Sequence, residues 1–121
     1  MITLKTLANA APQEVFDQVV AHARKQGEKS ILSGVCQYWN YDNETKKVSR
    51  CFAGCFFSND EYSTSFEQRM WASLVDDGIA PRAHQKLISD LQTIHDDCDV
   101  SNWESEFEWL AKHEGLYYEA K

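Results

Sequence analysis

The sequence contains few residues that interrupt regular structure and no long apolar segment. Only two prolines and five glycines occur among its 121 residues, which argues against long disordered stretches. No apolar run approaches the roughly 20 residues that a helix needs to cross a bilayer. The first residues also lack the basic region and apolar block of a secretory signal. We therefore expect a soluble cytoplasmic protein that does not contact a membrane.

Motifs that bind cofactors or perform catalysis are absent as well. The sequence contains no nucleophile elbow, no phosphate-binding loop and no dinucleotide-binding glycine pattern. A cysteine nucleophile needs a nearby histidine, and no spacing in the sequence pairs one of the four histidines with a cysteine. The sequence thus predicts a protein that is not an enzyme and that binds no cofactor.

Positive charge is scarce in the second half of a chain whose net charge is −7. Residues 1–60 contain seven Lys and Arg against six Asp and Glu, whereas residues 61–121 contain five against thirteen. Proteins bind nucleic acids by neutralising phosphates with Lys and Arg, so we expect no direct nucleic-acid binding. The acidic half suits a basic partner, and the alternative is a negative surface that only keeps the protein soluble.

Four segments show the spacing of apolar residues that is typical of amphipathic helices. The predicted helices are Pro12–Gln26, Thr64–Val75, a third that begins at Pro81, and a fourth that begins at Ser101 and closes at Gly115. Gly27 offers a left-handed stop for the first helix. Thr64–Glu67 and Ser101–Glu104 match capping boxes, in which a hydroxyl and a carboxylate satisfy free backbone donors.

The middle of the chain predicts a β-hairpin followed by a buried segment. Cys36–Tyr41 and Lys46–Cys51 read as strands on either side of a polar turn. Cys51–Phe57 is small and apolar, and Gly54 permits a close backbone approach there. We therefore predict an α+β fold: one mainly helical domain, residues 1–121, with about four helices and one short β-hairpin.

The four cysteines have three interpretations. No export signal is visible, so reduced thiols are expected rather than disulfides. In the first interpretation the cysteines are buried core residues. In the second they are zinc ligands, and in the third they are reactive thiols. The zinc site would use Cys36, Cys51 and Cys55 with His95 or Cys98 as the fourth ligand, and would make the chain a small zinc-stabilised structural protein. The flanking phenylalanines favour the core interpretation, so we predict no bound metal.

A partner-binding surface is predicted around the start of the last helix. Helical spacing directs Trp103, Phe107 and Leu110 inward and leaves the acidic side chains of that helix in solvent. The predicted binding residues are Asp96, Asp97, Asp99, Glu104, Glu108 and Trp109. A solvated helix face is the alternative for the carboxylates, and cover by the tail Leu116–Tyr118 is the alternative for Trp109. The aromatic-rich hairpin is a second candidate surface, which could form a homodimer.

Several short motifs resemble a family of small, uncharacterised proteins of tailed phages and prophages. They include Cys36-x-Tyr38, the later Cys51-x-Ala53-Gly54-Cys55, and Trp103-Glu104-x-x-Phe107. The resemblance implies the cytoplasm of a bacterial host and assigns no catalytic residue. With the small size, the acidic half and the surplus aromatics, it favours a non-enzymatic protein that binds a host protein. A basic partner, such as a nucleic-acid-handling enzyme or a host defence protein that is inhibited, fits this hypothesis.

Overall fold

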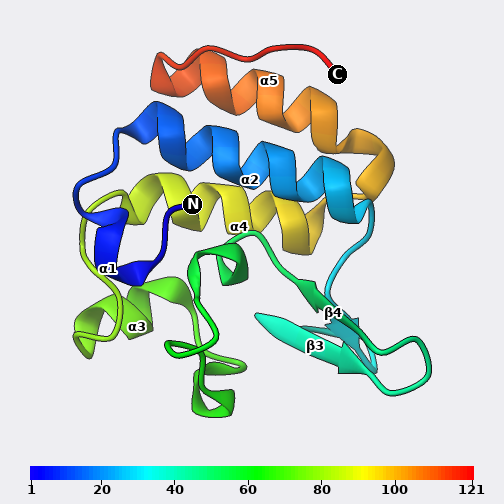
Figure 1. Cartoon of the computed structure of the whole chain (residues 1–121). Helices are drawn as coiled ribbons and strands as arrows, with labels where there is room; N and C mark the ends of the chain where they lie inside the picture. The colour runs from blue at the N-terminus through cyan, green and yellow to red at the C-terminus, as the bar shows by residue number, and fades with distance from the viewer.

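The computed structural model describes all residues from Met1 to Lys121 and has an α+β architecture, as predicted (Figure 1). Three long helices pack against one another: α2 (Pro12–Gln26), α4 (Gln85–Asp97) and α5 (Trp103–Glu114). The short helices α1 (Leu4–Leu7) and α3 (Trp71–Asp76) lie beneath them in Figure 1. No helix has the length and apolar character that a membrane span requires.

Helix α2 forms as its sequence predicts. Pro12 occupies the first helical position, where its missing N–H costs no hydrogen bond, and the Glu14 carboxylate accepts the Ala11 N–H at 2.8 Å. Gly27 ends the helix in the left-handed conformation, with φ 69°. The buried face consists of Val15, Phe16, Val19, Val20 and Ala23. Local signals and core packing agree along this segment, which is why the predicted bounds match the observed ones.

The predicted helix from Thr64 to Val75 is wrong in its first half. Thr64–Phe66 forms only a short 3-10 turn, and the chain is extended at Glu67 before α3 begins at Trp71. The Glu67 carboxylate does not cap this turn but accepts the backbone N–H groups of Tyr38 at 2.7 Å and of Trp39 at 3.1 Å. A long-range pair of donors has therefore replaced the expected local capping box.

The last two helices begin later than predicted. Helix α4 starts at Gln85 instead of Pro81, because His84 adopts a left-handed backbone conformation with φ 63°. Helix α5 starts at Trp103 after a 3-10 turn, without the predicted capping box. Gly115 ends α5 with φ 67°, as predicted.

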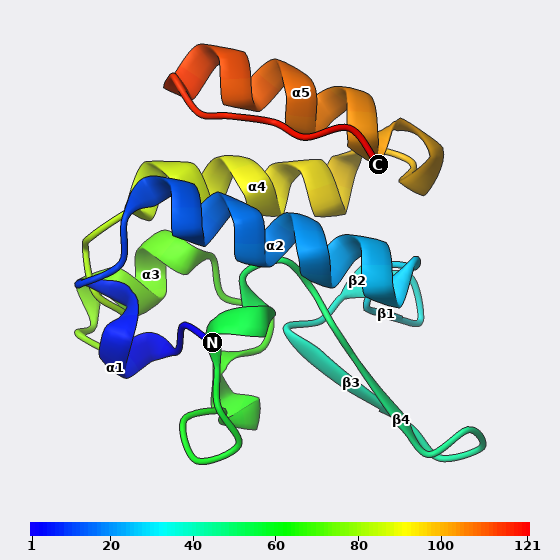
Figure 2. The ribbon, with the colours of Figure 1, turned by 45° about the horizontal axis from the view of Figure 1, so that its top comes forward.

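The β structure consists of two antiparallel pairs. The predicted hairpin is confirmed as β3 (Trp39–Asp42) and β4 (Lys47–Arg50), although both strands are shorter than predicted. A second pair, β1 (Ile31–Leu32) and β2 (Val35–Cys36), was not predicted. We call residues 31–50 the β extension, because β3 and β4 reach away from the helices (Figures 1 and 2). Tyr38 is its one buried residue.

The segment Cys51–Phe57 links the β extension to the core, and all seven of its residues are buried, as predicted. Phe52 packs against Phe107 and Trp103 of α5. At Gly54 an added Cβ would lie 2.2 Å from the carbonyl oxygen of Tyr38. Only glycine fits so close to another backbone, and this confirms the predicted close approach.

Candidate functional site

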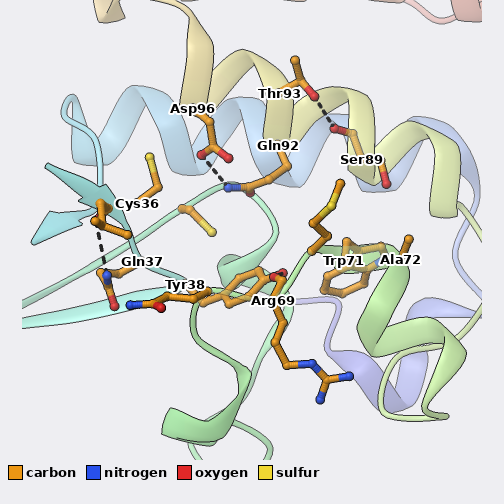
Figure 3. Close-up of a pocket in the computed structure, with 14 residues that line it drawn as sticks. Cys36, Gln37, Tyr38, Arg69, Trp71, Ala72, Ser89, Gln92, Thr93 and Asp96 are labelled. Carbon is orange, nitrogen blue, oxygen red and sulfur yellow. Dashed lines mark hydrogen bonds between the residues drawn. The ribbon is translucent and has the colours of Figure 1, made fainter.

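A cleft of about 340 Å³ lies between α4, the segment 35–38 and the segment 68–72 (Figure 3). Helix α4 contributes Ser89, Gln92, Thr93 and Asp96, which follow one another along the face of the helix that lines the cleft. Tyr38, Met70 and Trp71 form an aromatic and apolar part of its wall. The volume lies within the range of small-molecule sites, which are mostly apolar with a few positioned polar groups.

Two hydrogen bonds fix the tautomer of the fully buried His95 behind this cleft. The backbone N–H of Ser30 donates to His95 Nε2 at 3.1 Å, so Nε2 carries the lone pair. The neutral ring therefore bears its hydrogen on Nδ1, which lies 2.8 Å from Asp96 Oδ1. His95 donates to the carboxylate of Asp96 and holds it in place.

Gln92 supports the same carboxylate from one helical turn earlier. Its Nε2 donates to Asp96 Oδ1 at 2.8 Å, and its Oε1 accepts the backbone N–H of Ala53 at 2.8 Å. Oδ1 of Asp96 thus accepts two hydrogen bonds from positioned side chains. Neither of these side chains donates to Oδ2, and no Lys or Arg side chain forms an ion pair with Asp96.

Cys36 lies beside this pair but has the wrong chemistry for a nucleophile. The ligand atoms of Cys36, His95 and Asp96 lie within 4.8 Å of one another. Burial, with the neighbouring Asp96 carboxylate, raises the pKa of the Cys36 thiol to about 11, so the thiol is protonated at neutral pH. Neither ring nitrogen of His95 is free to accept its proton. The arrangement lacks the base that thiol activation requires.

The predicted zinc ligands do not come together. Cys51, Cys55 and Cys98 lie outside the group that Cys36 and His95 form with Asp96. Burial raises the pKa of Cys51 well above its ordinary value and that of Cys55 to about 12, and metal binding needs thiolates. Because Ser30 donates to Nε2 of His95, Nδ1 carries the hydrogen of the ring. Nδ1 therefore has no lone pair with which to bind a metal. Cys51 and Cys55 behave as core residues.

Two of the predicted partner-binding carboxylates make contacts within the chain. Asp96 holds His95 and Gln92, as described above. Glu104 pairs with Arg24 at 2.6 Å and accepts the Tyr118 hydroxyl at 2.7 Å. The Arg24 guanidinium is the main cause that lowers the pKa of Glu104. The prediction that Glu104 is free in solvent is therefore wrong, since it ties α2 and the C-terminal tail to α5.

The other predicted binding residues form an exposed acidic surface. We define the acidic face as these four residues, Asp97, Asp99, Glu108 and Trp109, together with Glu106, which was not among the predicted binding residues. Glu106 is half-buried, and the other three carboxylates are exposed. None of the four forms an ion pair with a Lys, Arg or His side chain.

Trp109 stands at a groove of about 320 Å³ between α4 and α5. Its side chain is 56% exposed, and its ring lies 3.8 Å from that of His113. Ile94 and Leu110 contribute apolar wall, and Glu106 contributes a carboxylate. The tail does not cover Trp109, because the N–H of Tyr117 binds Gln13 of α2 and Tyr118 reaches Glu104.

Sequence reasoning missed the residues that hold the site from a distance. Gln92 lies four residues before Asp96, so both side chains share one face of a helix. This spacing could have predicted their contact from the sequence. The contact of the Ser30 N–H with His95 could not be predicted in this way, because 65 positions separate the two residues in the sequence.

The chain matches no family model, and no curated protein or solved structure is significantly similar to it. The acidic face and the cleft beside Asp96 are therefore the two features of the molecule that indicate a function.

Proposed function

We propose that this protein acts without catalysis, by binding a basic protein on its acidic face. The observation that carries this proposal is Trp109, a large aromatic side chain that is more than half exposed at a groove. Tryptophan is enriched among the residues that dominate binding energy in protein interfaces. An apolar anchor of the partner would fill the groove beside Ile94 and Leu110.

Charge defines the class of partner. The four carboxylates of the acidic face, of which Glu106 lines the groove beside Trp109, have no cationic partner in this chain. Asp97 also ends α4, where the helix dipole favours positive charge. A partner that presents Lys or Arg beside an apolar residue would neutralise the negative charge of these carboxylates. The resemblance to phage proteins makes a bacterial host protein the partner that we propose, and a nucleic-acid-binding protein has the required basic surface.

A capture experiment with matched variants tests this function. The tagged protein, Trp109→Ala and Tyr117→Ala are incubated with bacterial lysate at low and high salt, and the bound proteins are quantified by mass spectrometry. Tyr117 is the control because it is an exposed aromatic residue, at 70%, whose backbone binds α2. We expect a basic protein whose capture falls with salt and with Trp109→Ala but persists with Tyr117→Ala.

The captured protein is then purified, and its affinity is measured by calorimetry. Substituting an anchoring tryptophan costs about 2 kcal/mol or more at such interfaces. Equal affinity for the native chain and Trp109→Ala would remove the acidic face as the binding surface. Binding that does not change with salt would remove the basic partner.

A further inference from the structure

We infer that the cleft beside Asp96 is a second binding site, which accepts a small organic cation: a primary ammonium or guanidinium group on an apolar body. This site is separate from the acidic face. Its basis is a carboxylate that the fold holds in place, with one oxygen left free by His95 and Gln92, at the wall of an open cleft.

The orientation of Asp96 is fixed before any ligand arrives. His95, itself fully buried, and Gln92 both donate to Oδ1, and each is held by a backbone N–H at its other end. Binding sites depend on such support, since a positioned group loses little freedom when the ligand binds. Oδ2 accepts no hydrogen bond from His95, Gln92 or a charged side chain, and the only other side chain that acts on this carboxylate is the weak donor Cys36, so Oδ2 is available to a stronger donor.

The charges around the cleft favour a cation. Arg69 is the one basic residue in the lining, and its guanidinium binds Ser73 and Asp77, pointing away from Asp96 in Figure 3. Lys29 donates only to the main-chain oxygen of Asp96, at 3.4 Å. Cys36 contributes a neutral thiol, because its pKa lies at about 11. Asp96 is thus the one acidic residue that lines this cleft, and its carboxylate forms no ion pair with Lys or Arg.

The walls define the remainder of the ligand. The cleft holds about 340 Å³, and Tyr38, Met70 and Trp71 line it with aromatic and apolar atoms. Cations associate favourably with aromatic side chains, and an apolar body would cover the wall. The ammonium group belongs either to a free amine or to a lysine side chain of a bound protein, and both place the same chemistry at Asp96.

Binding is tested by NMR titration of the whole protein. The probes are phenethylamine, its neutral analogue 2-phenylethanol, and a capped tetrapeptide with one lysine. We expect saturable amide shifts at Gln37, Gln92 and Asp96 with a cationic probe and weaker ones with the alcohol. Shifts with phenethylamine identify a free amine as ligand, and shifts with the peptide alone identify a lysine side chain.

The variant Asp96→Asn isolates the free oxygen. The asparagine oxygen still accepts from His95 and Gln92, so the change replaces only Oδ2. We expect affinity for the cationic probe to fall at least about tenfold, because a charge-assisted hydrogen bond is lost. Asp60→Asn is the matched control, since Asp60 is an exposed aspartate that lies neither in the cleft lining nor on the acidic face.

Three results would overturn the site. These are the absence of saturable shifts with both cationic probes, equal binding of the alcohol, and unchanged affinity in Asp96→Asn. The comparison of phenethylamine with its alcohol uses the native chain, so it decides the question even if the variant unfolds. Loss of capture in Trp109→Ala concerns the acidic face, and the two proposals can fail separately.

Discussion

The helices and the β extension are held together by different forces. The contacts between α2, α4 and α5 are apolar, and Phe16, Leu91 and Phe107 are each at most 1% exposed. In the β extension, by contrast, Tyr41 and Val48 pair across the hairpin and remain 53% and 44% exposed. The helical part is therefore stabilised by burial, and the β extension is too exposed to gain much from it.

Polar anchors hold the base of the β extension, beside the packing of Tyr38 against Phe57 and of Trp39 against Tyr62. The Gln26 side chain accepts the Arg50 N–H at 2.9 Å and donates to the Arg50 carbonyl at 2.8 Å. The Glu67 carboxylate holds the opposite strand through the N–H groups of Tyr38 and Trp39. The lesson is that a small protein can carry a weakly buried hairpin when side chains of the body satisfy the backbone at its base.

A pair of substitutions gives the largest expected difference between the two regions. Phe107→Ala empties a fully buried site and should lower the free energy of unfolding by about 3–5 kcal/mol. Val48→Ala, on the exposed hairpin, should change it by only about 0.5 kcal/mol. Urea unfolding followed by circular dichroism measures both. Similar losses in the two variants would refute the division into a buried body and a polar-anchored extension.

The anchors themselves can be removed. Glu67→Ala leaves the N–H groups of Tyr38 and Trp39 without their acceptor, at a cost of about 1–3 kcal/mol. Because this loss is local, amide hydrogen exchange should accelerate in residues 38–50 more than in α2. Glu44→Ala, in the exposed turn, is the control and should leave both rates unchanged. Uniform acceleration would mean that the hairpin unfolds only with the helices.

The comparison also explains which sequence predictions were confirmed. Helix α2 was predicted with its full bounds, because Pro12 and Gly27 act on their own neighbours and depend on no distant residue. The capping boxes at Thr64 and Ser101 failed, because Glu67 and Glu104 have stronger partners far along the chain. A local motif shows which bonds a side chain is able to make, but not which distant group competes for it.

The same limit applies to the candidate sites. Exposure of Trp109 followed from helical spacing, since Phe107 and Leu110 already occupy the inward face. The fixed tautomer of His95 depends on Ser30, which no pattern connects to it. The sequence therefore predicted the surface of a helix better than the cleft, whose walls come from three separate segments.

Charge reversal on α5 distinguishes the structural carboxylate from the exposed one. Glu104→Lys replaces an ion pair with repulsion against Arg24 and should lower the free energy of unfolding by about 1 kcal/mol, since the pair is partly exposed. Glu108→Lys, which breaks no ion pair, should leave it nearly unchanged. Thermal unfolding of both variants at low salt measures the difference. Equal melting temperatures would show that the Arg24 contact adds no stability.

The smallest expected effect lies at the joint between the two regions, where His22 of α2 meets the Arg50 carbonyl at 2.9 Å. Burial lowers the pKa of His22 below its ordinary value, and its hydrogen bond to Arg50 only partly opposes this. The unfolded chain then binds the proton more readily, so stability is complete above about pH 6.5 and declines as the pH falls below it. Carboxylates titrate below about pH 4.5 and do not contribute in this window. We expect His22→Gln to lose less stability than the native chain between about pH 7.5 and 5.5. Parallel pH profiles of the native chain and His22→Gln, measured by urea unfolding, would contradict the proposed role of this half-buried histidine.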